Sequence, residues 1–282
     1  MEKSVLKLDK ATPVFEKKEK KSIHTPSTIQ ADTLFTFTTK LEYIVAPLKT
    51  KILYSRFVEE DISYLKIPKI KKVGIPMKCF CDINLHRIGI HLYWYGYYGL
   101  AFSKEWGMKN KIQPIQYINP NSYLCKDFST AFSAAIKADI EKESKEQVLL
   151  KNYLIHELMY YKPYQGKIKN RNKNSDKKEL KCFADECEWR YIPDLSATDI
   201  EQIYFEDQMV SKTNLDLLSD SISDVPETGL HFEYEDIKYI IVENNSDFIE
   251  LTNVIDNLDL KNNEKNLLIS KILIWESSKG DF

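Results

Sequence analysis

The sequence has no uninterrupted apolar run that approaches the roughly 20 residues of a membrane-spanning helix. Its first ten residues, MEKSVLKLDK, lack the apolar core of a secretory signal. Its five cysteines are odd in number, and a reducing compartment would keep them as free thiols. These absences predict a cytoplasmic protein without a membrane segment and without a disulfide.

Glycine is also scarce, with eight residues in 282. The chain contains neither GxGxxG nor GxxxxGK[ST], so the familiar phosphate-binding loops are absent. No cysteine lies in a recognisable catalytic signature, and the spacing of the four candidate zinc ligands matches no usual zinc ribbon or knuckle. We therefore expect no metal site at Cys79, Cys81, Cys182 and Cys187.

Charge is divided unevenly along a chain whose composition, 43% hydrophobic and 29% charged, is that of a globular protein. Residues 1–193 carry 34 Lys and Arg against 22 Asp and Glu, whereas residues 194–282 carry 6 against 20. Such polarity either steers a partner or forms solvated faces. We expect a flexible basic tail over 1–30 and a single domain over 31–282, basic to about 193 and acidic from 194 to 282.

Hydrophobic periodicity predicts strands and helices that alternate irregularly, which favours an α+β fold with a mixed, mostly antiparallel sheet and flanking helices. A capping-box pattern from Thr39 to Glu42 predicts a helix that Pro47 limits to about two turns. The other expected helices cover 85–95, segments around 128–140 and 150–161, 199–205, and segments after Ser246 and near Lys265. The expected strands cover 34–38, 75–83, 98–103, 114–118 and 182–193, with a strand pair within 230–242.

One stretch, CFCDINLHRIGIHLYWYGYYGLAFSKEW at 79–106, concentrates aromatic side chains and glycines. In the strand 98–103 the bulky side chains face one way and the small ones the other. The bare face admits either a closely packed helix, which is the commoner use, or a flat ligand, and Gly99 would mark the close approach. The candidate ligand or partner surface comprises His91, Tyr95, Gly96, Tyr98, Gly99, Lys104 and Trp106.

The segment DECEWR contains a pair of acids two residues apart in an expected strand, so that Glu186, Glu188 and Arg190 share a face. If the protein is an enzyme, these residues are the catalytic candidates, for acid–base work or for stabilising a developing cation. The alternative is an edge strand whose outward face carries a surface salt bridge worth about 0.2–1 kcal/mol.

The segment 162–181 is rich in basic residues and poor in large apolar ones, which predicts a loop or a mobile hairpin. It lacks the interleaved aromatics of a groove for single-stranded nucleic acid. Nucleic acid and an acidic protein partner therefore remain equal alternatives for its contact residues, which are Lys167, Lys169, Arg171 and Lys173.

Several of these motifs together resemble the AbiGi family of bacterial abortive phage-resistance proteins. The matching elements are Cys79 to Leu85, His91, Tyr95 to Gly99, Lys104 with Trp106, and Asp185 to Arg190. The resemblance covers roughly residues 33–260, and Asn84 stands where the family tends to have proline. It implies a phage-defence component that acts as the antitoxin of a nucleotidyltransferase-like toxin, without a cofactor.

The order of a strand ending in Phe-Thr, a Tyr-Gly strand and a Glu-x-Glu strand is also similar to ADP-ribosyltransferase-like folds. That likeness implies an alternative function, an NAD-dependent enzyme in which Glu188 stabilises an oxocarbenium-like centre and Glu186 positions the acceptor. Thr36 departs from the histidine or arginine that such folds usually offer on the first strand. A nucleic-acid-binding regulator is the third alternative.

Overall fold

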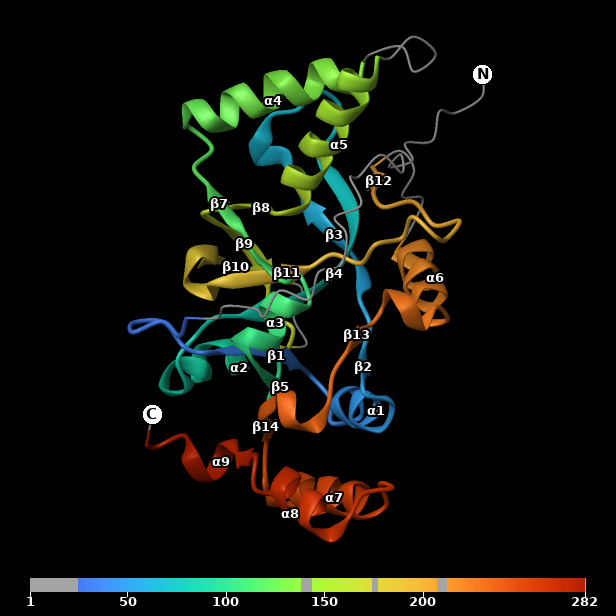
Figure 1. Cartoon of the computed structure of the whole chain (residues 1–282). Coiled ribbons are helices and arrows are strands. Elements are labelled where there is room, and N and C mark those ends of the chain that lie inside the picture. Colours follow the sequence, from blue (N-terminus) through green and yellow to red (C-terminus); the bar gives the residue numbers. More distant parts are fainter. Residues whose placement is uncertain (1–24, 138–143, 174–176, 207–211, 282) are drawn as a thin grey trace.

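The computed structural model describes residues 25–137, 144–173, 177–206 and 212–281 (Figure 1). Most of the predicted tail over 1–30 lies outside these residues. The described residues form a main sheet of nine strands in the order β15-β14-β5-β1-β4-β11-β6, with β3 and β12 also paired to β4. Its strands are β1 (Thr33–Thr38), β3 (Arg56–Asp61), β4 (Lys72–Cys81), β5 (Tyr98–Ser103), β6 (Gln113–Pro114), β11 (Glu188–Tyr191), β12 (Tyr204–Phe205), β14 (Ile237–Val242) and β15 (Ile272–Ile274).

The middle of the sheet is antiparallel. Strand β1 pairs with β5 along its whole length, and β5 pairs on its other side with β14. Strand β15 is parallel to β14, so the sheet is mixed. With helices packed on both faces, this arrangement confirms the predicted α+β class. Strands from the basic part and the acidic part of the sequence thus share one sheet.

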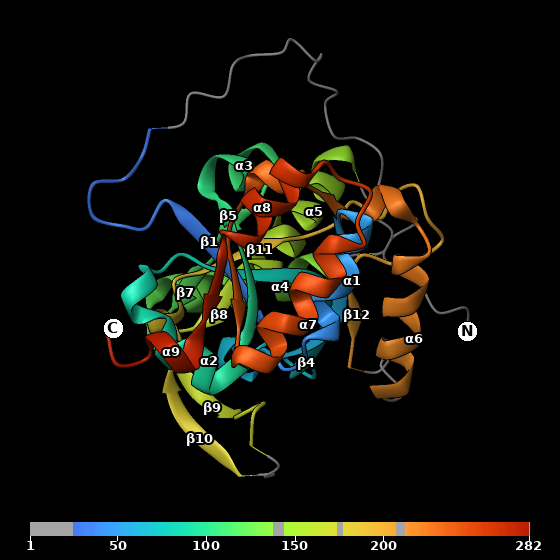
Figure 2. The same ribbon diagram turned by 90° about the horizontal axis from the view of Figure 1, so that it is seen from below.

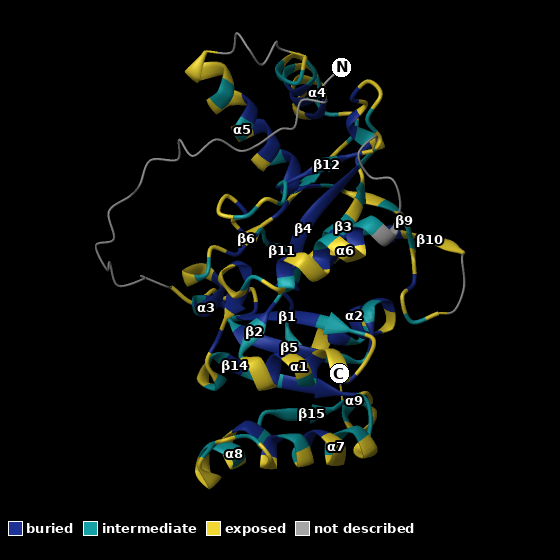
Figure 3. Ribbon diagram, turned by 90° about the vertical axis from the view of Figure 1, so that its right-hand side faces the viewer, coloured by how far each residue is buried: buried dark blue, intermediate teal, exposed yellow. Residues whose placement is uncertain are grey.

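The small-residue face of β5 is covered by a helix, as the commoner interpretation predicts. Ala101 packs in one cluster with Ile88 and Leu92 of α2. The opposite face, with Leu100 and Phe102, packs against four helices (Figure 3). The helices around this part of the sheet are α1 (Glu42–Thr50), α2 (Ile88–Tyr95), α3 (Lys104–Lys109), α7 (Asn245–Asp256) and α8 (Asn262–Ile269).

A second core lies at the other end of the molecule, where α4 and α5 pack over β3 and the first part of β4. Helix α6 covers β3 from the side. No helix in the described part of the chain is both long and apolar enough to cross a membrane. The remaining helices are α4 (Tyr123–Ala135), α5 (Lys145–Met159), α6 (Lys212–Ser223) and α9 (Trp275–Ser278).

Three two-stranded sheets complete the fold. One of them, the β9–β10 hairpin, projects from the body of the molecule (Figure 2). It shows that the basic segment 162–181 is largely a hairpin, one of the two predicted forms. The strands of these sheets are β2 (Ile52–Leu53) with β13 (Leu230–His231), β7 (Gln116–Ile118) with β8 (Tyr161–Pro163), and β9 (Gln165–Lys169) with β10 (Lys178–Cys182).

Three local predictions are wrong. The capping box of α1 does not form, because the N-cap is Leu41 without a side-chain cap, and the helix runs through Pro47, which it buries. The segment 199–205 is not helical, since the buried Gln202 side chain bonds the backbone of neighbouring loop residues instead. The expected strand pair within 230–242 does not form either, because β13 pairs with β2.

Candidate functional site

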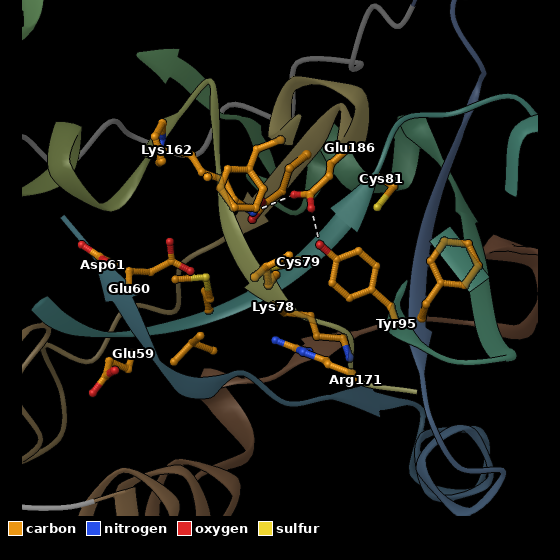
Figure 4. Close-up of a pocket in the computed structure, with 18 of the residues that line it drawn as sticks. Glu59, Glu60, Asp61, Lys78, Cys79, Cys81, Tyr95, Lys162, Arg171 and Glu186 are labelled. Atoms are coloured by element: carbon orange, nitrogen blue, oxygen red, sulfur yellow. Dashed lines mark hydrogen bonds and ion pairs between the residues drawn. The ribbon is translucent and has the colours of Figure 1, made fainter. Parts of the chain in front are cut away.

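A cavity of about 540 Å³ opens beside β4 where its two neighbours separate (Figure 4). Strand β3 pairs with β4 up to Met77, whereas β1 reaches it only at Cys81. Residues of all three strands line the cavity, and the β9–β10 hairpin and the segment before β11 close its other sides. The volume falls in the range of small-molecule sites.

Glu186 and Glu188 lie together in the wall of this cavity, and Lys162 bridges them. The Nζ atom of Lys162 is 2.6 Å from Oε2 of Glu186 and 2.6 Å from Oε2 of Glu188. Both carboxylates are buried, at 3% and 5% exposure. The predicted proximity of the two acids is therefore correct, but the exposed edge strand is not, because β11 is paired on both sides by β4 and β6.

The two acids do not share one regular strand. Glu186 ends a 3-10 turn that begins at Phe183, and Cys187 adopts a left-handed conformation with φ 45° before β11 begins at Glu188. That reversal, rather than the two-residue period of a strand, aims both carboxylates at Lys162. Sequence periodicity thus predicted correctly that the two acids are neighbours, but a turn, and not one continuous strand, brings them together.

The ion pairs extend in two directions from the acids. On one side, Lys181 Nζ lies 2.6 Å from Oε1 of Glu186, which also accepts a hydrogen bond from the Tyr95 hydroxyl. On the other side, the guanidinium of Arg190 donates to Glu188 Oε1 at 2.7 Å and to the Met159 carbonyl at 2.8 Å. Arg190 is also 3.4 Å from Glu60. We call this set the charge network; its members are Glu60, Glu186, Glu188, Lys162, Lys181 and Arg190.

The charge network balances three carboxylates against three cations. Burial alone would raise the pKa of Glu188, but Arg190 and Lys162 hold that pKa well below its usual range. Burial alone would lower the pKa of Lys162, but the two glutamates hold it well above its usual range. Glu186, Glu188 and Lys162 are therefore ionised at neutral pH, and both oxygens of each buried acid already accept from cations.

The two candidate glycines lie where β5 and α2 approach β1. Gly96 ends α2 with φ +120°, and a Cβ there would lie 1.9 Å from the Thr38 carbonyl oxygen. A Cβ on Gly99 would lie 3.0 Å from the Phe37 ring and from the Thr36 carbonyl oxygen. Both mark close backbone approach, and the constraint is tighter at Gly96.

The other candidates from the 79–106 stretch do not gather into one surface. Tyr95 lines the cavity, but Tyr98 instead donates to Asp247 of α7 at 3.0 Å. Lys104 is buried in an ion pair with Asp82 at 2.8 Å, and Trp106 is buried and stacks on Phe102. The expectation of a shared surface is therefore wrong for these buried members.

His91 is also buried, beside the rings of Phe37 and Tyr95. Neither of its ring nitrogens has a hydrogen-bond partner in the described part of the chain. Burial, together with the positive charge of Lys181, lowers the pKa of His91 to about 4. The imidazole is therefore neutral at physiological pH and belongs to the core.

The predicted contact residues of the β9–β10 hairpin are exposed. Lys167 and Lys169 lie in β9, and Arg171 and Lys173 lie in the turn that follows, where Lys173 forms an ion pair with Glu179 at 3.1 Å. Lys167 and Arg171 also line the mouth of the cavity. The hairpin is tied to the end of α2 by a backbone hydrogen bond from Arg171 to the Trp94 carbonyl and by the Asn172 side chain, which donates to the Leu92 carbonyl. The exposed cations are Lys167, Lys169, Arg171 and Lys173.

Sequence reasoning missed the lysines that organise the cavity. Lys162 and Lys181 stand at the two ends of the basic segment and were indistinguishable from its solvated charges, yet both are paired with Glu186. Lys78 lies within a predicted strand, and its cavity position follows only from the divergence of β1 and β3. The one available signal was a lysine inside an otherwise apolar strand, IPMKCF.

Metal ligation finds no support in the described residues, where no cluster of three or more His, Cys, Asp or Glu is placed to hold an ion. All five cysteines are free thiols. Burial raises the pKa of Cys79 and Cys81, so these thiols stay protonated near neutral pH.

Comparison with known proteins places this fold and site in a family. Residues 51–243 match the family of the abortive phage resistance protein AbiGi, described as an antitoxin. The chain is also 33% identical over 244 residues to the abortive phage resistance protein AbiGi of Lactococcus lactis subsp. cremoris. That alignment covers 80% of this chain and 98% of the Lactococcus protein. No solved structure matches the chain. The chain belongs to the AbiGi family of abortive phage resistance proteins.

Proposed function

We propose that this protein is the antitoxin of a two-gene phage-defence system and neutralises a nucleotidyltransferase-like toxin by binding it through the basic side of the β9–β10 hairpin. The family description as an antitoxin supports the existence of a toxin partner. The single observation that supports this surface is the row of four exposed cations on a hairpin that projects from the fold (Figure 2).

The chemistry of the proposed partner suits this row. Nucleotidyl transfer uses divalent ions held by carboxylates, so the active cleft of such an enzyme carries negative charge. The exposed cations of the β9–β10 hairpin are complementary in charge to that cleft. The hairpin is held by the contacts of Arg171 and Asn172 with α2, which lowers the entropic cost of ordering it in a complex.

Catalysis by the acid pair receives less support. Stabilising an oxocarbenium-like centre requires a carboxylate whose charge is available to the substrate. Glu188 instead gives one oxygen to Arg190 at 2.7 Å and the other to Lys162 at 2.6 Å. The charge network is internally neutral, so we favour neutralisation by contact over an ADP-ribosyltransferase-like reaction.

Reversing the four hairpin cations to glutamate tests the proposal. Four exposed ion pairs at about 0.2–1 kcal/mol each predict at least about a fourfold loss of affinity for the toxin and a flatter salt dependence. Toxin binding is measured by pull-down across a salt series, and growth rescue is measured on co-expression with the toxin. The residues changed are Lys167, Lys169, Arg171 and Lys173.

A matched control makes the same change of charge elsewhere on the surface and should keep both toxin binding and rescue. Undiminished binding by the hairpin variant would remove the hairpin from the interface. Tight, salt-dependent binding of RNA by the purified antitoxin, lost in the hairpin variant while toxin binding persists, would assign the hairpin to nucleic acid. The control reverses the exposed Lys49, Lys66, Lys126 and Lys137.

A further inference from the structure

The cavity retains positive charge after its ion pairs are counted. Of the five carboxylates that line it, Glu60, Glu186 and Glu188 belong to the charge network, and Glu59 pairs with Lys72 at 2.8 Å. The fifth, Asp61, is exposed and accepts a hydrogen bond from the backbone of Ser63. Three lining cations, in contrast, form no ion pair with any carboxylate of the described residues. These cations are Lys78, Lys167 and Arg171.

Lys78 is the most informative of them, because it lies on β4, lines the cavity and is half-buried. In Figure 4 its side chain lies near that of Arg171, and the two positive charges interact. Burial, and then the charge of Arg171, lower the pKa of Lys78. A protein rarely places two cations together in a partly desolvated cleft without an anion to neutralise them.

The remaining lining offers groups for the rest of a ligand. Tyr64 lines the cavity, and its buried hydroxyl has no hydrogen-bond partner among the described residues. Phe37 and Tyr54 add aromatic surface to the walls. Apolar surface combined with convergent polar groups is typical of sites for small organic molecules.

We propose that the cavity binds a nucleotide-sized organic phosphate, with the phosphate held by Lys78 and Arg171 and with Lys167 at the mouth. Arginine provides a planar fork that matches phosphate oxygens, and lysine provides a compact point charge. The volume of about 540 Å³ accommodates the organic part as well as the phosphate. Lys167 and Arg171 also belong to the proposed toxin-binding surface, whereas Lys78 belongs to the cavity alone.

Calorimetric titration of the purified full chain tests the site with four probes: ATP, AMP, inorganic phosphate and adenosine. We expect ATP and AMP to bind, and adenosine to bind at least tenfold more weakly than AMP. Lys78→Met and Arg171→Met should each weaken AMP binding at least tenfold. The matched control is Lys169→Met in β9 of the same hairpin as Arg171. Lys169 does not line the cavity, so its replacement should leave AMP binding unchanged.

Four outcomes would overturn the proposal: no binding of either nucleotide at about 1 mM, equal binding of adenosine and AMP, binding of inorganic phosphate without AMP, or an equal loss in Lys169→Met. Each variant is first checked for cooperative unfolding. Arg171 is exposed, so its variant keeps the test valid if Lys78→Met fails to fold. Lys78→Met should retain toxin binding, which separates failure of this site from failure of the hairpin proposal.

Discussion

Replacing Glu188 by glutamine removes one charge from the neutral charge network and leaves the other members in place. The carboxylate contacts Arg190 at 2.7 Å and Lys162 at 2.6 Å, and the Arg190 side chain is fully buried. Glutamine keeps the size of the side chain but turns one of the two acceptors into a donor, which faces either Arg190 or Lys162. When it faces Arg190, the guanidinium keeps only the Met159 carbonyl and the 3.4 Å contact with Glu60.

The expected loss is large because the remaining cations cannot move into water. Removing one partner of a buried ion pair typically costs about 3–5 kcal/mol. For a chain of this size each kcal/mol lowers the midpoint of thermal unfolding by about 2–4 °C, so we expect a fall of about 6–20 °C. An exposed pair provides the contrast: Glu59→Gln breaks a contact with Lys72 whose side chains are 48% and 43% exposed, and should cost at most about 1 kcal/mol.

Urea unfolding followed by circular dichroism, with both variants at pH 7, measures the difference. The folded-state pKa of Glu188 is depressed, so its stabilisation is complete above the ordinary value of 4.5 and is lost as the pH falls through the folded-state value. The gap between wild type and Glu188→Gln should therefore narrow as the pH falls below 4.5. A loss at pH 7 no greater than that of Glu59→Gln would refute the charge network as a source of stability.

Three further expectations follow from the same structure. Gly96→Ala should destabilise the fold more than Gly99→Ala in chemical unfolding, because a Cβ at residue 96 would lie 1.9 Å from the Thr38 carbonyl and the backbone there has φ +120°. Gly280→Ala is the control and should be neutral, because a Cβ there has nothing within 4 Å. Lys78→Met should raise the unfolding midpoint at pH 7, because burial disfavours the charged lysine. This gain in stability should shrink as the pH rises toward 10.5, where the lysine loses its charge in the folded and the unfolded state. An unchanged midpoint at pH 7 would contradict burial of the Lys78 cation. The imidazole of His91 should titrate by NMR near pH 4, and a midpoint above 6 would place it in contact with solvent.

The strands and helices that depend on local pattern were predictable from the sequence. Strand β5 begins and ends at the predicted residues, and the alternation of Leu100 and Ala101 gave both of its faces correctly. The segment 199–205 was not, because the Gln202 side chain accepts a hydrogen bond from the Leu195 backbone and donates one to the Pro193 carbonyl, in the loop that precedes the segment. Local propensity carries no information on such tertiary contacts.

The site was predictable in its members but not in its assembly. The sequence indicated the acids and the basic hairpin as two separate candidates. The fold joins them through Lys162 of β8, just before the hairpin, and Lys181 of β10, which both contact Glu186. Burial of these charges could not be inferred from the sequence, because charged residues are mostly solvated and the expected exposure followed that rule.

The position of β14 ties completion of the fold to completion of translation. Strand β5 emerges early from the ribosome, but the neighbour that covers one of its edges, β14, begins only at Ile237. A chain that stops earlier would leave β5 with a row of unpaired backbone groups, which invites association with other chains and proteolysis. Truncation before Ile237 would therefore turn β5, an interior strand of the complete sheet, into its new edge.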